Sequence, residues 1–125
     1  MLNDLLKSID KIYIAFGATD FRKQIPALLQ LVQDEYKKNP YEKCAYIFCN
    51  KKKTSIKILT YDRNGFILAQ KVLLNVDKMR FKWPRNEGEM KNITKTQLEW
   101  LLSGLEIYPK KIFQDINLDD KKIAI

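Results

Sequence analysis

The chain has 125 residues, of which 46% are hydrophobic and 30% are charged, with a net charge of +8 and no histidine. This length predicts a single domain with a hydrophobic core. The apolar runs are too short to cross a membrane and no signal peptide is expected, so we expect a soluble, cytoplasmic protein. Without histidine and with only two cysteines, neither a zinc site nor a redox site is expected.

The positive charge is concentrated in one part of the chain. Ten basic and two acidic residues lie between Lys51 and Arg85, whereas the rest of the chain has thirteen of each. This distribution indicates an anion-facing surface on an otherwise neutral domain. The alternative is a solvated, lysine-rich sheet face that only aids solubility.

The first half of the chain predicts a strand, a helix and a second strand. Ile12, Ile14 and Phe16 alternate with other residues, which indicates a strand that ends at Gly17. Pro26 suits the first turn of a helix that continues to about residue 38 and is stopped by Asn-Pro. Residues 44–49 predict the second strand. The cysteines at its two ends should point to opposite faces and remain unbridged.

Residues 55–72 predict a β-hairpin. Asp62 and Gly65 suit a type I turn that is closed by a left-handed glycine and a bulge. This register pairs Lys57 with Lys71 and leaves the opposite face apolar, whereas a plain two-residue Asn64-Gly65 turn would shift the pairing by one residue. Opposed like charges cost up to about 1 kcal/mol, so we interpret the paired lysines as a sign of an anionic partner.

The second half of the chain predicts an edge strand and a helix. Phe81 and Trp83 alternate with basic residues in a short edge strand that Pro84 ends, and residues 85–92 read as a loop. Thr94 is the expected N-cap of a helix, with a glutamine three residues later that completes a capping box. The buried stripe of this helix is expected to consist of Leu98, Leu101, Leu102 and Leu105.

These elements predict an α+β fold. We expect a mainly antiparallel sheet of four or five strands, with two helices packed on one face. Residues 1–109 would form a single domain and residues 110–125 a tail of uncertain order. The opposite sheet face, which would carry Lys57, Lys71 and the basic turn at 50–54, is the expected working surface.

Three blocks of the chain share their order and spacing with a known family. They are GATDFRKQIPALLQLV, YIFCNKKKTSIKILTYDRNGFILAQKVL with RFKWP, and ITKTQLEWLLSGLEI. Over about residues 11–108 the chain resembles the TnpB (Orf2) accessory protein family of IS66-type insertion sequences. The resemblance implies a small non-catalytic protein that is encoded beside a separate transposase and is needed with it for transposition.

The resemblance also implies a set of characteristic residues. Its polar members are Asp20, Arg22, Lys23, Lys57, Asp62 and Lys71, with Trp83 as the aromatic mark and Gly17, Gly65 and Pro84 within the motifs. Two positions depart from the family pattern. The family usually has tryptophan at Tyr61 and arginine at Val72, so one expected basic contact is missing.

The basic residues are the candidates for nucleic-acid binding through phosphates. They are Arg22, Lys23, Lys51, Lys52, Lys53, Lys57, Arg63, Lys71, Arg80 and Lys82. Structural roles are the alternative at some positions: Asp20 could cap a turn and Arg22 could pair with an acid. Phe81 and Trp83 could stack on unpaired bases, or they could belong to the core.

An enzymatic function is not expected. Asp20, Asp62, Glu87 and Glu89 do not form the clustered carboxylates that two-metal chemistry needs, and no histidine can act as a general base. We therefore expect no catalytic residues, no metal and no cofactor. The expected function is that of an accessory protein for transposition that binds DNA through a basic sheet face. The alternative is an adaptor that docks on the transposase without contacting DNA.

Overall fold

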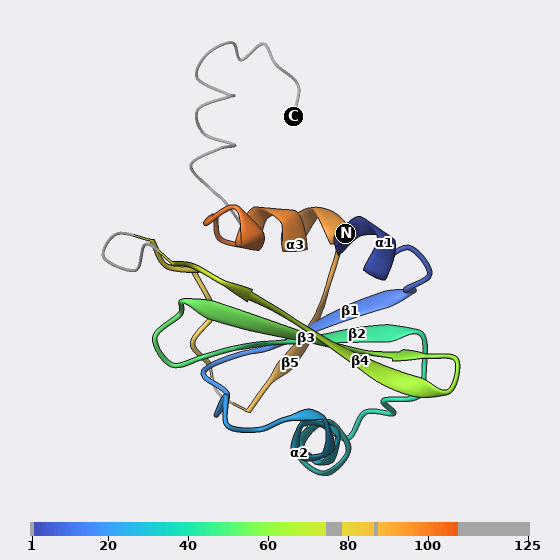
Figure 1. Cartoon of the computed structure of the whole chain (residues 1–125). Helices are drawn as coiled ribbons and strands as arrows, with labels where there is room; N and C mark the ends of the chain where they lie inside the picture. Colours follow the sequence, from blue (N-terminus) through green and yellow to red (C-terminus); the bar gives the residue numbers. More distant parts are fainter. Residues whose placement is uncertain (1, 75–78, 87, 108–125) are drawn as a thin grey trace.

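The protein folds as one mixed β-sheet with helices on both faces (Figure 1). The computed structural model describes residues 2–74, 79–86 and 88–107, so the predicted tail at 110–125 lies outside the described residues. The strands are β1 (Lys11–Ala15), β2 (Cys44–Cys49), β3 (Ser55–Asp62), β4 (Gly65–Val72) and β5 (Met90–Ile93). The helices are α1 (Leu2–Leu5), α2 (Ile25–Gln30), the π-helical turn η1 (Leu31–Glu35) and α3 (Lys95–Leu102).

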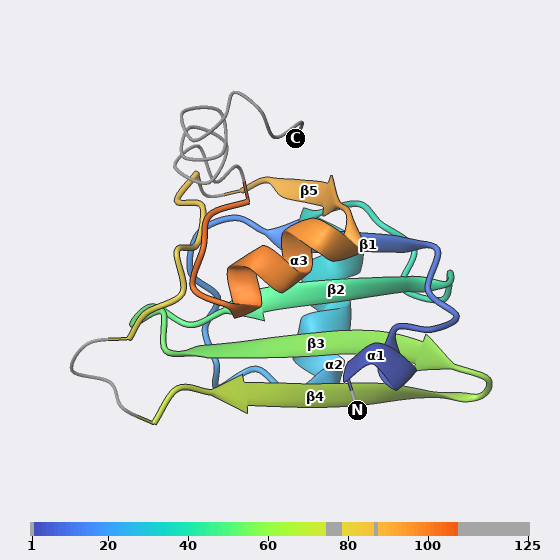
Figure 2. The same ribbon diagram turned by 90° about the horizontal axis from the view of Figure 1, so that it is seen from above.

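The strands follow the spatial order β4-β3-β2-β1-β5 (Figure 2). β2, β3 and β4 form the predicted antiparallel meander, and β5 pairs antiparallel with β1. β1 and β2 run parallel, because the chain crosses back through α2 and η1 and begins β2 at the end of the sheet where β1 began. The predicted α+β fold with a mainly antiparallel sheet is confirmed.

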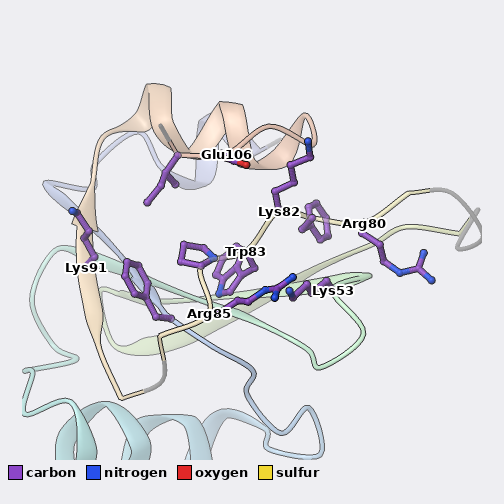
Figure 3. A pocket seen from close by; sticks show the side chains of 11 residues that line it. Lys53, Arg80, Lys82, Trp83, Arg85, Lys91 and Glu106 are labelled. Carbon is purple, nitrogen blue, oxygen red and sulfur yellow. The ribbon is translucent and has the colours of Figure 1, made fainter. Parts of the chain in front are cut away.

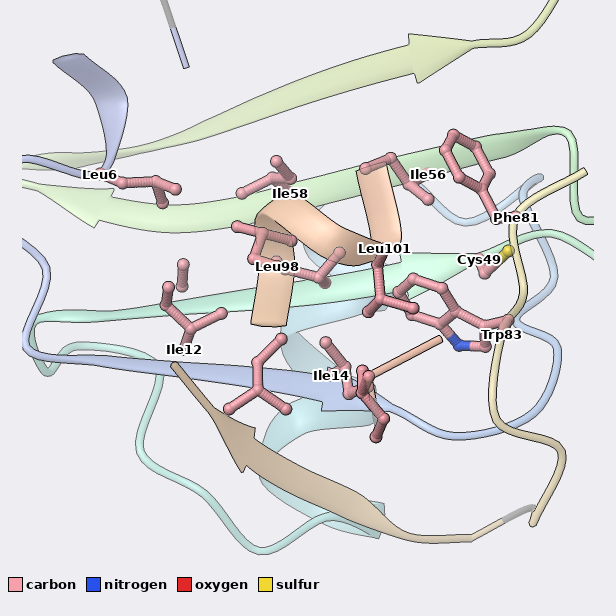
Figure 4. Packing of buried hydrophobic residues seen from close by; sticks show 14 of the residues in the cluster. Leu6, Ile12, Ile14, Cys49, Ile56, Ile58, Phe81, Trp83, Leu98 and Leu101 are labelled. Carbon is pink, nitrogen blue, oxygen red and sulfur yellow. The ribbon is translucent and has the colours of Figure 1, made fainter. Parts of the chain in front are cut away.

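The two long helical segments cover opposite faces of the sheet. Leu98 and Leu101 of α3 pack on one face against a cluster that includes Ile14 (Figure 4). Leu28 of α2 packs on the other face with Tyr46 and Leu59. The prediction of both helices on one face was therefore wrong. All six residues of β2 are buried, which is the pattern of a strand whose two faces are both covered.

The hairpin register also differs from the predicted one. Asp62 pairs with Gly65 across a two-residue turn of Arg63 and Asn64, so neither the predicted register nor its Asn64-Gly65 alternative is present. Arg63, and not the glycine, adopts the left-handed conformation, with φ 57°. Lys57 therefore pairs with Gln70 and Lys71 with Ile56, so the two lysines point to opposite faces. The predicted lysine pair does not exist, and neither sheet face is open.

The helix ends follow the local signals in the sequence. Pro26 lies in the first turn of α2, and η1 ends before Lys37, which has a positive φ of 56°. The Thr94 Oγ1 accepts a 3.0 Å hydrogen bond from the Gln97 amide, and the Gln97 Oε1 accepts one of 2.9 Å from the Thr94 amide. The predicted capping box is therefore confirmed, and it fixes the start of α3.

Two segments of the second half were assigned incorrectly. Residues 80–84 form no strand. The edge strand is instead β5 (Met90–Ile93), which overlaps the end of the predicted loop at 85–92. The alternation in 80–84 is nevertheless real, because Phe81 and Trp83 are buried while Arg80 and Lys82 are exposed. The predicted placement of Cys44 and Cys49 is confirmed: both are free and buried, one in each core cluster.

Candidate nucleic-acid interface

Basic side chains from separate parts of the sequence line one groove, with a cavity volume of about 720 Å³. Lys53 comes from the β2–β3 turn, Lys91 from β5, and the others from the segment 80–85, around Trp83 (Figure 3). We call this site the basic groove. Its lining residues are Phe16, Lys53, Arg80, Phe81, Lys82, Trp83, Pro84, Arg85, Lys91, Glu106 and Ile107.

The segment 80–85 forms one wall of the groove and is held at three points. The Phe81 amide donates a 2.8 Å hydrogen bond to the Lys53 carbonyl, and the Pro84 carbonyl accepts one of 2.7 Å from the Gly17 amide. The Trp83 Nε1–H donates a 2.7 Å bond to the buried Ala15 carbonyl. The anchored Phe81 and Trp83 are buried, and their basic neighbours in the segment are not. Arg80, Lys82 and Arg85 are thus displayed as exposed cations.

The β2–β3 turn fixes Lys53 on the groove. The Asn50 Oδ1 accepts hydrogen bonds from the amides of Thr54 (2.9 Å) and Ser55 (3.0 Å). Lys53 adopts a left-handed φ of 61°, and its amide donates a 3.1 Å bond to the Asn50 carbonyl. Asparagine side chains stabilise turns by this kind of bond. Lys51 and Lys52 are exposed in the same turn but do not line the groove.

The charge of the basic groove is strongly unbalanced. Five cations line it, and Glu106 is the one carboxylate among the described lining residues. Within the described part of the chain, Lys53, Lys82 and Arg85 form no ion pair with a carboxylate. Several cations around one concave surface produce a positive potential that attracts anions.

Two smaller cavities continue the basic groove. One of about 140 Å³ shares Lys53, Trp83 and Arg85 with it, and one of about 360 Å³ shares Arg80 and Lys82. The larger of these two also includes Lys71. The positively charged surface therefore extends along the segment 80–85 towards β4.

Lys57, a predicted phosphate contact, is buried with only 3% of its surface exposed. Its Nζ donates hydrogen bonds to the carbonyls of Phe21 (3.0 Å) and Lys23 (2.9 Å) and lies 4.9 Å from the centroid of the Phe21 ring. Burial lowers the pKa of Lys57, and the charge of Asp20 opposes this effect. Lys57 thus holds the loop before α2 against the sheet, and its ammonium group is bonded to two backbone carbonyls.

Asp20 and Arg22 form the ion pair that the structural alternative predicted. The Asp20 carboxylate accepts bonds from the Arg22 side chain, the shortest 2.8 Å from Nη2, and one of 2.9 Å from the Arg22 amide. The Arg22 side chain bonds lower the pKa of Asp20 from its ordinary value of 3.8 to about 2. This pair shapes the loop, although the Arg22 side chain remains 91% exposed.

The structure thus brings together only part of the predicted set. Lys53, Arg80 and Lys82 line the basic groove, and Lys71 lies in the adjoining cavity. Lys57 anchors the loop that carries Arg22 and Lys23, and neither of these two residues lines the groove. Arg63 lies in the β3–β4 turn, at the opposite end of β3 from Lys53.

Five lining residues were missed in the sequence, and one of them, Ile107, follows the predicted C-terminal helix. Arg85 continues the basic alternation of 80–84 and could have been included on that signal. Phe16 was read only as part of a strand. Lys91 and Glu106 carry no local signal, because their positions depend on the pairing of β5 and on the chain after α3.

The comparisons with known proteins cover this whole site. A family model described as "IS66 Orf2 like protein" matches residues 10–111, which include every residue of the basic groove. The chain belongs to the IS66 Orf2-like family. A relative from Sinorhizobium fredii (strain NBRC 101917 / NGR234), named "Uncharacterized protein y4hO", is 35% identical over 96 residues, or 77% of this chain and 81% of the relative. No solved structure matches the chain.

Membership of the IS66 Orf2-like family gives the protein an accessory role in transposition, associated with the IS66 transposase system. The described residues contain no group of three or more histidine, cysteine, aspartate or glutamate side chains that could hold a metal ion. Among the described helices, none has the length and apolar character that crossing a bilayer requires.

Proposed function

We propose that this protein binds DNA phosphates in the basic groove while it assists the transposase of its element in the cytoplasm. One observation carries the proposal: five cations from three separate stretches of sequence line a single concave surface. Bringing like charges together is unfavourable unless an anion is bound among them. Lysine and arginine side chains are also the usual donors to DNA phosphates.

The family supports the identity of the anion. Because an accessory protein of transposition works at a DNA element, a phosphate backbone is the anion that it meets in quantity. In this proposal the protein contributes binding and positioning, and the transposase carries out strand cutting and joining. The groove residues act as donors to phosphate, and none of them is assigned a catalytic role.

A nuclease-controlled pull-down tests this function against docking on the transposase without DNA. We expect the purified protein to shift element-end DNA in a gel, and its capture of transposase to fall after nuclease treatment. The variant Lys82→Gln/Arg85→Gln should lose most of the shift. If the wild type shifted no DNA and captured transposase equally well after nuclease treatment, the groove would be a protein-docking site and the proposal would be wrong.

A further inference from the structure

The basic groove combines cations with an apolar interior. Five of its eleven described lining residues carry no ionisable group: Phe16, Phe81, Trp83, Pro84 and Ile107. A DNA duplex presents its phosphates outward and keeps the faces of its bases stacked inside, so it would engage only the cations. An unpaired nucleotide has both an anionic phosphate and a flat apolar base, and it matches both parts of the groove.

Only some of the apolar residues are accessible to such a base. Phe81 and Trp83 are 1% and 4% exposed, so neither ring offers a face for stacking. Phe16 and Pro84 are half-buried and line the groove beside the cations. An aromatic ring surrounded by cations is the combination that proteins use to bind single strands.

Phe16 is held firmly at the end of β1. Part of its side chain packs against the core cluster that contains Trp83. Its amide donates a 2.8 Å hydrogen bond to the Glu89 carbonyl, and the next amide, that of Gly17, bonds to the Pro84 carbonyl. The ring is therefore supported on one side and faces the groove on the other, which lowers the entropy cost of stacking.

We propose that the basic groove binds single-stranded DNA, with an unpaired base against Phe16 and the flanking phosphates on Lys53, Lys82 and Arg85. This inference rests on the proposed function and narrows its ligand. The cavity of about 720 Å³ is within the usual size range of small-ligand sites. The adjoining cavities extend the basic surface beyond one nucleotide, which favours a strand over a free nucleotide.

The first test compares ligands and needs no protein variant. Fluorescence anisotropy would measure the affinity of the full chain for a labelled oligo-dT strand, a duplex of equal length, and an abasic strand with the same phosphates. We expect the oligo-dT strand to bind more tightly than the abasic strand by roughly 5- to 100-fold, the effect of one base–aromatic stack. Equal affinity for the oligo-dT strand and the abasic strand would overturn the proposed stacking.

The second test changes the ring. Phe16→Leu keeps an apolar side chain against the core but removes the aromatic face, so oligo-dT affinity should fall roughly tenfold while duplex affinity stays within about twofold. Phe16→Tyr should restore the oligo-dT affinity, and Lys43→Gln, at the opposite end of β2, should leave it unchanged. An unchanged oligo-dT affinity in folded Phe16→Leu would contradict the inference.

The remaining outcomes separate this inference from the proposed function. If the wild type binds the duplex as tightly as the oligo-dT strand, phosphate binding stands but the preference for single strands is wrong. If it binds neither, the proposed function fails as well. Displacement of oligo-dT by thymidine monophosphate at equal nucleotide concentration would identify a free-nucleotide site. Tighter binding of oligo-U than of oligo-dT would assign the groove to RNA. Either result would overturn the inference.

Discussion

The indole N–H of Trp83 donates a 2.7 Å hydrogen bond to the carbonyl of Ala15, and both residues are buried. This bond joins the segment 80–85 to the end of β1, although the two are far apart in the sequence. It therefore fixes the wall of the basic groove to the central sheet. Trp83 thus has a structural role, because it holds the segment that carries Arg80, Lys82 and Arg85.

Trp83→Phe should destabilise the protein by about 1–3 kcal/mol, because the buried Ala15 carbonyl loses its donor. Urea unfolding would measure this loss. Tyr41→Phe provides the control, since the Tyr41 side chain is 56% exposed and its substitution should change the unfolding free energy by less than about 0.5 kcal/mol. Equal stability of the two variants would show that the bond does not hold the segment.

Leu101→Ala should cost roughly 2–5 kcal/mol of unfolding free energy. Leu101 is a residue of α3 that is fully buried between this helix and the sheet, so its truncation leaves a cavity there. Leu74→Ala is the matched control, because Leu74 is 89% exposed. A Leu101→Ala loss as small as that of the control would mean that α3 does not pack on the sheet in solution.

Lys57→Met and Lys71→Met should differ clearly in stability. The first change removes the donor to the carbonyls of Phe21 and Lys23 and should destabilise the protein by about 1–3 kcal/mol. Lys71 is exposed, so its change should stay within about 0.5 kcal/mol. Thermal or urea unfolding of both variants distinguishes them. A neutral effect of Lys57→Met would show that the ammonium does not anchor the loop.

The titration of Asp20 tests the geometry of the same loop. The Arg22 hydrogen bonds lower its folded pKa to about 2, so the carboxylate should remain ionised well below pH 3.8. Its contribution to stability is therefore present above the unfolded pKa of 3.8 and is lost as the pH falls through about 2. A carbon-detected NMR titration should give this midpoint in the wild type and a value nearer 3.8 in Arg22→Gln. Lys23→Gln should shift it less, because Lys23 contributes the weakest of the effects.

Local patterns in the sequence predicted most elements but not their placement. The capping box at Thr94 and the strands β1 and β2 depend on neighbouring residues, so they could be read directly, although β1 ends at Ala15 and not at the predicted Gly17. The hairpin register could not, because β3 is buried on both faces and its apolar residues fit either register. Arg63 then adopted the left-handed conformation that the prediction gave to Gly65.

The basic groove depends on long-range contacts and so was predicted only in part. The region between Lys51 and Arg85, which charge counting indicated, supplies four of the five cations of the basic groove, but the expected sheet face is covered by α2 and α3. The cations meet instead at the end of the sheet, where the buried side chains of Phe81 and Trp83 anchor the segment 80–85. β5 was not predicted, because it is only four residues long and Ile93 is the one buried residue of this strand.

The salt dependence of DNA binding tests the central claim, that the basic groove engages phosphates, most directly. For wild type on a duplex, log affinity should fall with log salt at a slope near −4, as expected for about four to five neutralised phosphates. Lys82→Gln/Arg85→Gln should flatten the slope by nearly 2, whereas Lys11→Gln/Lys43→Gln, at the other end of the sheet, should leave it unchanged. Equal slopes for wild type and the groove variant, with both proteins folded, would contradict the account.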